Sequence, residues 1–187
     1  FYDVIRIDHF HGFAEYYAVP YGEKSALNGT MKKGPGMDFF NTLKEQMGEI
    51  PMIAEDLGTV TEENTKLLKD SGLPGMKVLQ FAFTSWNSVY VTHRHEKNCV
   101  VYTGTHDNNT TVGWFMEDVD NSSKATISAL IGADVRRPDD VCQKLIEFAY
   151  ASDSRFAIIP MQDILKLDSK SRMNTPGTVG TNWAWRM

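Results

Sequence analysis

The amino-acid sequence predicts an α/β protein built on a parallel sheet. Short apolar segments of strand length alternate with segments whose apolar residues recur at helical spacing, and this alternation is typical of parallel sheets. The predicted order is strand, helix, strand, helix, strand, loop, strand, two helices and strand. Two architectures fit this order, a doubly wound sheet and a (β/α) barrel. In both of them functional side chains lie at the C-terminal ends of the strands.

Five segments have the length and apolar content of buried strands. The clearest lies between Pro51 and Gly58, where an apolar run ends abruptly in Glu55 and Asp56. The predicted strands cover residues 4–8, 52–55, 76–81, 100–106 and 157–161.

Helices are predicted between these strands. Asp38 and Thr61 are the expected N-caps of two helices that end at Gly48 and Gly72. Two further helical patterns cover residues 122–133 and 139–151. Residues 21–36 are expected to form a polar loop that closes with the turn GPG (34–36). A phosphate-binding role for this turn is the weaker alternative, because the Lys and Ser/Thr of a P-loop are absent.

Composition narrows the class of protein. With 187 residues, 42% of them apolar, the chain has the size of one domain. A net charge of -5 and a pI near 5.5 argue against nucleic acid and acidic membranes as partners. No segment has the pattern of a membrane helix or a signal peptide, and Cys99 and Cys142 are expected to be reduced thiols of a cytoplasmic protein. Because Phe1 comes only a few residues before a buried strand, we expect the chain to be part of a longer protein.

Three of the predicted strands end in acidic residues, namely Asp8, Glu55 and Asp107. Two carboxyl groups that flank one sugar bond are the usual groups of glycoside chemistry, in which one protonates the leaving oxygen and the other attacks the sugar or stabilises its transition state. A single acid at a strand end more often caps a helix or faces water. Three of them together favour a catalytic site.

Other side chains near these strand ends have competing interpretations. Arg6 lies on the same side of its strand as Asp8 and would hold it ionised, although an ordinary ion pair explains the spacing equally well. The His-x-His pairs at 9–11 and 93–95 place two imidazoles on one strand face but have no third ligand, so we expect no metal site. Among the aromatic residues, we expect only Trp114 to stack on a sugar ring.

The strand-end segments resemble a known enzyme family. RIDHF (6–10), IAEDLG (53–58) and TGTHDN (103–108) are similar to the three catalytic motifs of the 4-α-glucanotransferases, also called amylomaltases or disproportionating enzymes, which are related to the α-amylases. GPG (34–36), PGM (74–76), VLQFAF (78–83), MNTPG (173–177) and NWAWR (182–186) also resemble this family, in the same order. The α-amylases share only the first three motifs, which favours the transferase. His11 and Met31 depart from the family pattern, which usually has Arg and an aromatic residue there.

The resemblance implies a role for each strand-end residue. Asp8 would be the nucleophile and Glu55 the general acid/base of a retaining reaction on α-1,4-glucans such as maltooligosaccharides, starch or glycogen, with the two carboxyl groups about 5–6 Å apart. Asp107 would stabilise the transition state, and substrate-binding roles would fall to Arg6, His106 and Asp56. No cofactor is implied.

The resemblance also implies that residues 1–187 are the C-terminal part of a (β/α)8 catalytic barrel that begins at its fourth strand. Such a partial barrel would be inactive alone and would self-associate through exposed sheet edges. Two alternatives are an α-amylase-like hydrolase and a non-catalytic α-glucan-binding module.

Overall fold

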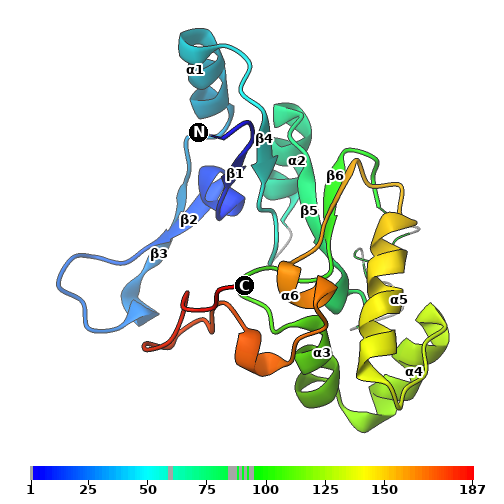
Figure 1. Cartoon of the computed structure of the whole chain (residues 1–187). Coiled ribbons are helices and arrows are strands. Elements are labelled where there is room, and N and C mark those ends of the chain that lie inside the picture. The colour runs from blue at the N-terminus through cyan, green and yellow to red at the C-terminus, as the bar shows by residue number, and fades with distance from the viewer. Residues whose placement is uncertain (1, 59–60, 84–87, 89, 91, 93–94) are drawn as a thin grey trace. The chain divides into compact units, whose positions relative to one another are not determined.

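A computed structural model describes residues 2–58, 61–83, 88, 90, 92 and 95–187 (Figure 1). The chain forms two compact units, Phe1–Met76 and Lys77–Met187. Each unit combines helices with parallel strands, so the predicted α/β class is confirmed. No helix of the described residues is long and apolar enough to span a membrane.

The first unit is built around two parallel strands and two helices. Strand β1 (Ile5–Ile7) pairs with β4 (Met52–Ala54). Helix α2 (Glu62–Ser71) begins as predicted at Thr61, whose hydroxyl accepts the amide of Asn64, and ends at Gly72 with φ of 67°. Helix α1 (Met37–Met47) begins one residue before the predicted cap, so Asp38 lies in its first turn, where an acid favours the helix dipole. The core of this unit contains Phe10, Phe40, Ala54 and Leu67.

An antiparallel hairpin in the first unit was not predicted. Strands β2 (Glu15–Ala18) and β3 (Thr30–Lys33) pair within the segment expected to be aromatic-rich chain and polar loop, and Figure 1 shows them as a two-stranded ribbon. Side chains on both faces of the ribbon are exposed, Tyr16 and Tyr17 among them. A ribbon exposed on both faces has no alternation of apolar and polar residues, and that alternation is the signal on which strand prediction depends.

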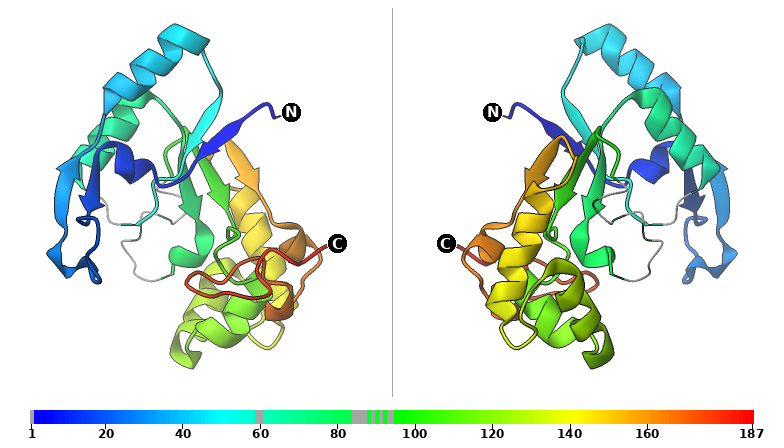
Figure 2. Two further views of the ribbon diagram at one scale, coloured as in Figure 1. Left: turned by 90° about the vertical axis from the view of Figure 1, so that its left-hand side faces the viewer. Right: turned by 90° about the vertical axis from the view of Figure 1, so that its right-hand side faces the viewer.

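The second unit contains a three-stranded sheet in the order β5–β6–β7. Strand β5 (Gly75–Val78) begins two residues before the unit boundary, and β6 (Cys99–Tyr102) is parallel to β7 (Phe156–Ile158). Helix α5 (Pro138–Tyr150) lies against this sheet in both views of Figure 2, and its residues Val141 and Leu145 are fully buried beside Val101 of β6. The other helices are α3 (Thr111–Gly113), α4 (Asn121–Ile131) and α6 (Met161–Ile164).

Two predicted strands of this unit, 76–81 and 100–106, are shorter in the structure. Strand β5 stops at Val78, and Leu79–Phe81 form a 3₁₀ turn in which the Gln80 amide donates to the Thr103 carbonyl. Strand β6 stops at Tyr102 because the Thr103 side chain turns toward Asp163. A π-helical turn, Trp114–Asp118, follows α3 where no element was expected. Cys99 and Cys142 are both buried, and neither forms a disulfide.

Candidate active site

Asp8 directly follows β1. Arg6 Nη1 donates to Asp8 Oδ1 at 2.7 Å, and the Asp8 side chain is 76% exposed. Arg6 Nε also donates to the sulfur of Met76 at 3.4 Å, which fixes the guanidinium on its other side. Because exposed ion pairs contribute little to stability, the contact serves mainly to orient Asp8.

Glu55 directly follows β4 and occupies the same sheet edge as Asp8. The parallel register pairs Ile7 with Ala54, so the next position along each strand is Asp8 on one and Glu55 on the other. The Glu55 amide donates to the Ile7 carbonyl at 2.9 Å, which extends the strand pairing by one bond. The two acids therefore lie at the C-terminal end of adjacent parallel strands.

The Glu55 carboxylate is held at both oxygens by backbone amides. His9 N–H donates to Oε2 at 2.7 Å, and Leu57 N–H donates to Oε1 at 3.1 Å. His9 can present its amide in this direction because its backbone is left-handed, with φ of 48°. The two amides fix the position of the carboxylate, and no cationic side chain of the described residues hydrogen-bonds to it.

Asp56 is turned away from the Glu55 carboxylate and toward β5. Its Oδ1 accepts the amide of Met76 at 2.6 Å. A Cβ at Gly75 would lie 2.7 Å from Asp56 Oδ2, so only glycine leaves room for this contact. Asp56 thus fixes the chain after α2 against the end of β4.

The first His-x-His pair does not share a strand face. His9 precedes a 3₁₀ turn, Phe10–Phe13, and His11 lies within it, where its Nε2 donates to the Leu57 carbonyl at 2.7 Å. His93 lies outside the described residues. Among the residues that are described, no group of three or more His, Cys, Asp or Glu side chains could hold a metal ion.

His106 and Asp107 belong to the second unit, in the loop that follows β6. Asp107 Oδ2 lies 3.3 Å from His106 Nε2, and its Oδ1 accepts the side-chain amide of Asn174 at 2.6 Å. Arg172 Nη2 donates to the Asp107 carbonyl at 2.7 Å. Sequence reasoning gave Arg172 and Asn174 no role. The signal for Asn174 was the resemblance of segment 173–177 to the family, and Arg172 lies just before that segment.

Trp183, not Trp114, presents an aromatic ring near this loop. Trp114 is only 9% exposed and packs in the core beside Phe115, so its predicted sugar-stacking role is wrong. Trp183 is 53% exposed, and its ring centroid lies 5.0 Å from that of His106. Its φ of 64° is unusual for a bulky residue, and its amide donates to the Met173 carbonyl at 2.7 Å.

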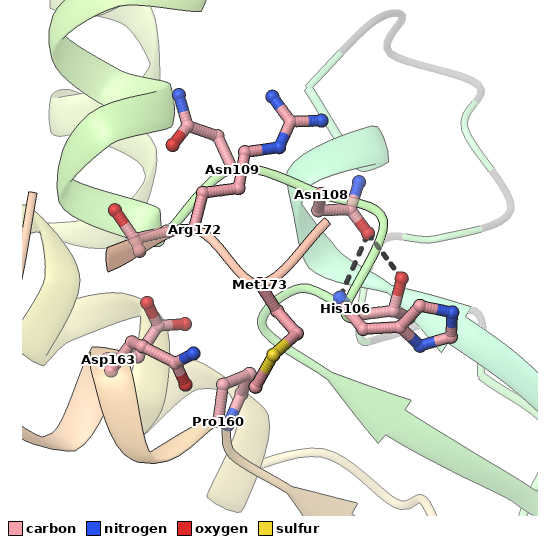
Figure 3. Close-up of a pocket in the computed structure, with 10 residues that line it drawn as sticks. His106, Asn108, Asn109, Pro160, Asp163, Arg172 and Met173 are labelled. Atoms are coloured by element: carbon pink, nitrogen blue, oxygen red, sulfur yellow. Dashed lines mark hydrogen bonds between the residues drawn. The ribbon is translucent and has the colours of Figure 1, made fainter. Parts of the chain in front are cut away.

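A cavity of about 130 Å³ lies beside the His106 loop (Figure 3). Three segments line it: the loop after β6, the start of α6 and residues 172–173. Asn108 Oδ1 accepts two hydrogen bonds at 2.9 Å, one from the amide and one from the hydroxyl of Thr105. These bonds give the loop a fixed turn immediately beside Asp107.

The family of the chain follows from comparison with known proteins. A sequence model of the family described as 4-alpha-glucanotransferase, glycoside hydrolase family 77, matches residues 1–187. The chain belongs to the 4-alpha-glucanotransferase family.

Individual 4-alpha-glucanotransferases match the chain from end to end. The enzyme of Clostridium butyricum is 46% identical over 186 residues, which are 99% of this chain and 38% of that protein. The chloroplastic/amyloplastic enzyme DPE1 of Arabidopsis thaliana is 46% identical over 187 residues, which are 100% of this chain and 32% of that protein. The chain therefore spans less than two fifths of the length of these relatives.

Solved amylomaltases have the same fold. The structure of the Streptococcus agalactiae amylomaltase in complex with acarbose is 39% identical, with a TM-score of 0.92, and the match covers 100% of this chain and 37% of that one. The amylomaltase of Corynebacterium glutamicum is 18% identical with a TM-score of 0.74, covers 97% of this chain and 31% of that one, and shows the fold alone.

His11 and Met31, the two residues expected to depart from the family pattern, lie in different surroundings. His11 contacts the Leu57 carbonyl, and the Leu57 amide in turn donates to Glu55. Met31 lies on β3, where it is 55% exposed. His11 thus supports the segment that holds Glu55, and Met31 is a surface residue of the hairpin.

Proposed function

We propose that the protein containing this chain transfers α-1,4-glucan segments from a donor maltooligosaccharide to the 4-hydroxyl of an acceptor glucan or glucose. Residues 1–187 would form the C-terminal part of its (β/α)8 catalytic barrel. The observation that carries the proposal is the placement of Asp8 and Glu55 at one edge of adjacent parallel strands, in a chain that the 4-alpha-glucanotransferase family matches throughout.

The reaction is a double displacement with retention. In the first step Asp8 attacks the anomeric carbon of the donor sugar while Glu55 protonates the departing glucan oxygen. In the second step Glu55 removes the proton from the acceptor 4-hydroxyl, which displaces Asp8 from the anomeric carbon. This chemistry requires the two carboxyl groups to lie about 5–6 Å apart.

The hydrogen bonds of the two acids support this division of roles. The exposed Asp8 carboxylate is oriented by the Arg6 guanidinium at Oδ1, and no described residue hydrogen-bonds to its Oδ2, which can therefore attack the sugar. Glu55 is held more firmly, and its longer bond, from the Leu57 amide to Oε1, leaves Oε1 the more available oxygen for proton transfer. A fixed carboxyl group can be positioned to protonate the leaving oxygen, as a general acid requires.

The remaining site residues would act on the donor sugar. Asp107 and His106 would bind hydroxyl groups of the donor ring and stabilise the transition state, with Asn174 holding the Asp107 carboxylate. Asp56 would have a substrate-binding role. We also propose a cytoplasmic location, since Cys99 and Cys142 form no disulfide.

Incubation of the full-length protein with maltotriose tests this function. Transfer yields glucose together with longer maltooligosaccharides and no net gain of reducing ends. A net gain of reducing ends would instead identify an α-amylase-like hydrolase. Retardation in a glycogen-containing native gel, with no new sugars formed, would identify a binding protein.

A further inference from the structure

Asp163, in helix α6, is a buried carboxylate that the proposed reaction does not use. Its side chain is 1% exposed. It accepts three hydrogen bonds, from the Thr103 hydroxyl at 2.5 Å, the Thr111 amide at 2.7 Å and the Thr111 hydroxyl at 2.8 Å. Within the described part of the chain, Asp163 takes part in no ion pair.

These three bonds connect the two ends of one loop. Thr103 directly follows β6 and Thr111 begins α3, so residues 104–110 form the loop that carries His106 and Asp107. Asp163 comes 60 residues after Thr103 and 52 after Thr111. The carboxylate therefore closes the loop at its base from a distant part of the chain.

The interior of the same loop is held by Gln80. Its side-chain amide donates to the Asn109 carbonyl at 2.9 Å, and a Cβ at Gly104 would lie only 2.7 Å from that amide nitrogen. The loop thus packs directly on Gln80 and is tied at both ends by Asp163. Few conformations satisfy all of these contacts at once.

A buried carboxylate is a costly way to close a loop. Its oxygens must all be hydrogen-bonded, and an apolar side chain of similar size often stabilises a core equally well or better. The Asp163 carbonyl accepts the Cys142 thiol at 3.3 Å, and the pKa of that thiol is raised to about 12, first by burial and then by the negative charge of Asp163. A charge retained at such cost points to a requirement for one loop geometry.

We propose that Asp163 is a positioning residue for glucan transfer: its carboxylate sets the conformation of residues 104–110 and through them the placement of Asp107. This inference rests on the proposed function, in which Asp107 acts on the donor sugar. Asp163 acts only through the loop, whose residue His106 lines the same cavity (Figure 3).

The test compares Asp163→Asn with a matched control in the full-length protein. Asparagine keeps the shape but has one acceptor oxygen in place of two. Either the two threonine hydroxyls must reorient to face its NH₂ group, or the Thr111 amide loses its acceptor. The control is Asp120→Asn, which makes the same change at an exposed helix cap that also accepts from hydroxyls and amides. Thr111→Val removes one hydroxyl donor and preserves the buried shape, which provides a second variant if Asp163→Asn does not fold.

Two measurements are made well below the unfolding temperature. Maltotriose transfer should show kcat reduced about tenfold or more in Asp163→Asn with KM within about threefold, because an interaction made in the transition state is lost. Hydrogen exchange should accelerate in residues 103–111 and not in α5. Thr111→Val should lower kcat and accelerate the exchange of this loop to a smaller extent. Asp120→Asn should change neither kcat nor the exchange.

Wild-type kcat and wild-type exchange of this loop in Asp163→Asn would overturn the inference. Exchange that rises equally across the second unit would also overturn it, since that pattern indicates general destabilisation. If the wild-type protein transfers no glucan, the proposed function fails, and the exchange measurement still decides whether Asp163 holds the loop.

Discussion

Replacing Glu55 with glutamine separates the chemical role of this residue from its structural one. The Glu55 carboxylate accepts the amides of His9 and Leu57, one at each oxygen. Glutamine has one acceptor oxygen, so one of these amides must face an NH₂ group. Loss of one hydrogen bond to a charged acceptor at this half-buried position should lower the free energy of unfolding by about 1–2 kcal/mol. The fold should therefore survive the substitution.

The catalytic effect should be much larger. General acid/base catalysis contributes about a hundredfold to ten-thousandfold, which corresponds to about 3–5 kcal/mol of activation free energy. We expect Glu55→Gln to reduce the rate of maltotriose transfer by the full-length protein at least about a hundredfold. Urea unfolding of the same sample measures the loss of stability. The control is Glu49→Gln, an equivalent change in an exposed ion pair with Lys44, which should leave both quantities near wild type. Retention of even a tenth of the wild-type turnover would show that the role of Glu55 is misassigned.

Three further predictions follow from particular contacts. Asn174→Ala should reduce kcat/KM by about tenfold, because the Asp107 carboxylate loses a hydrogen bond from the side-chain amide at 2.6 Å, and unchanged kinetics would exclude this role. Stability should fall as pH rises from about 9 toward 12, because the Cys142 thiol ionises in the unfolded chain while burial raises its pKa to about 12 in the folded one. In Cys142→Ala the free energy of unfolding should fall less steeply with pH over this range. An identical pH dependence would show that Cys142 does not contribute to it. The isolated 187-residue chain should self-associate in sedimentation velocity and transfer no glucan, because β1 and β7 expose large apolar side chains such as Ile5 and Phe156, and an active monomer would refute this.

The sequence was sufficient to locate the parallel strands and the longer helices. Several of them are bounded by Gly, Pro or a capping residue, as Thr61 and Gly72 bound α2. The positions of Asp8 and Glu55 at strand ends followed from the same reasoning, because an apolar run that stops at an acid marks the end of a buried strand. Local patterns carry this information, so no knowledge of distant contacts was needed.

Distant contacts explain what the sequence did not reveal. The predicted strand 76–81 continues as an apolar run, yet it turns after Val78 because Gln80 bonds to the Thr103 carbonyl. The role of Asn174 depends on a contact with Asp107 that spans 67 residues. No sequence pattern distinguishes Trp114 from Trp183. Trp114 is buried and Trp183 is exposed because of how distant segments pack around each of them.

In the proposed reaction Asp8 forms a covalent bond to the donor sugar. The most direct measurement treats the full-length Glu55→Gln variant with an α-maltosyl fluoride donor, whose fluoride leaves without protonation. Asp8 should then displace fluoride, and the glycosyl-enzyme should persist because no base activates an acceptor. Peptide mass spectrometry should find one maltosyl group on the peptide that contains Asp8, and none after Asp8→Asn is added. A maltosyl group on Asp56 or Asp107, or release of maltose of inverted configuration with no adduct, would show that Asp8 is not the nucleophile.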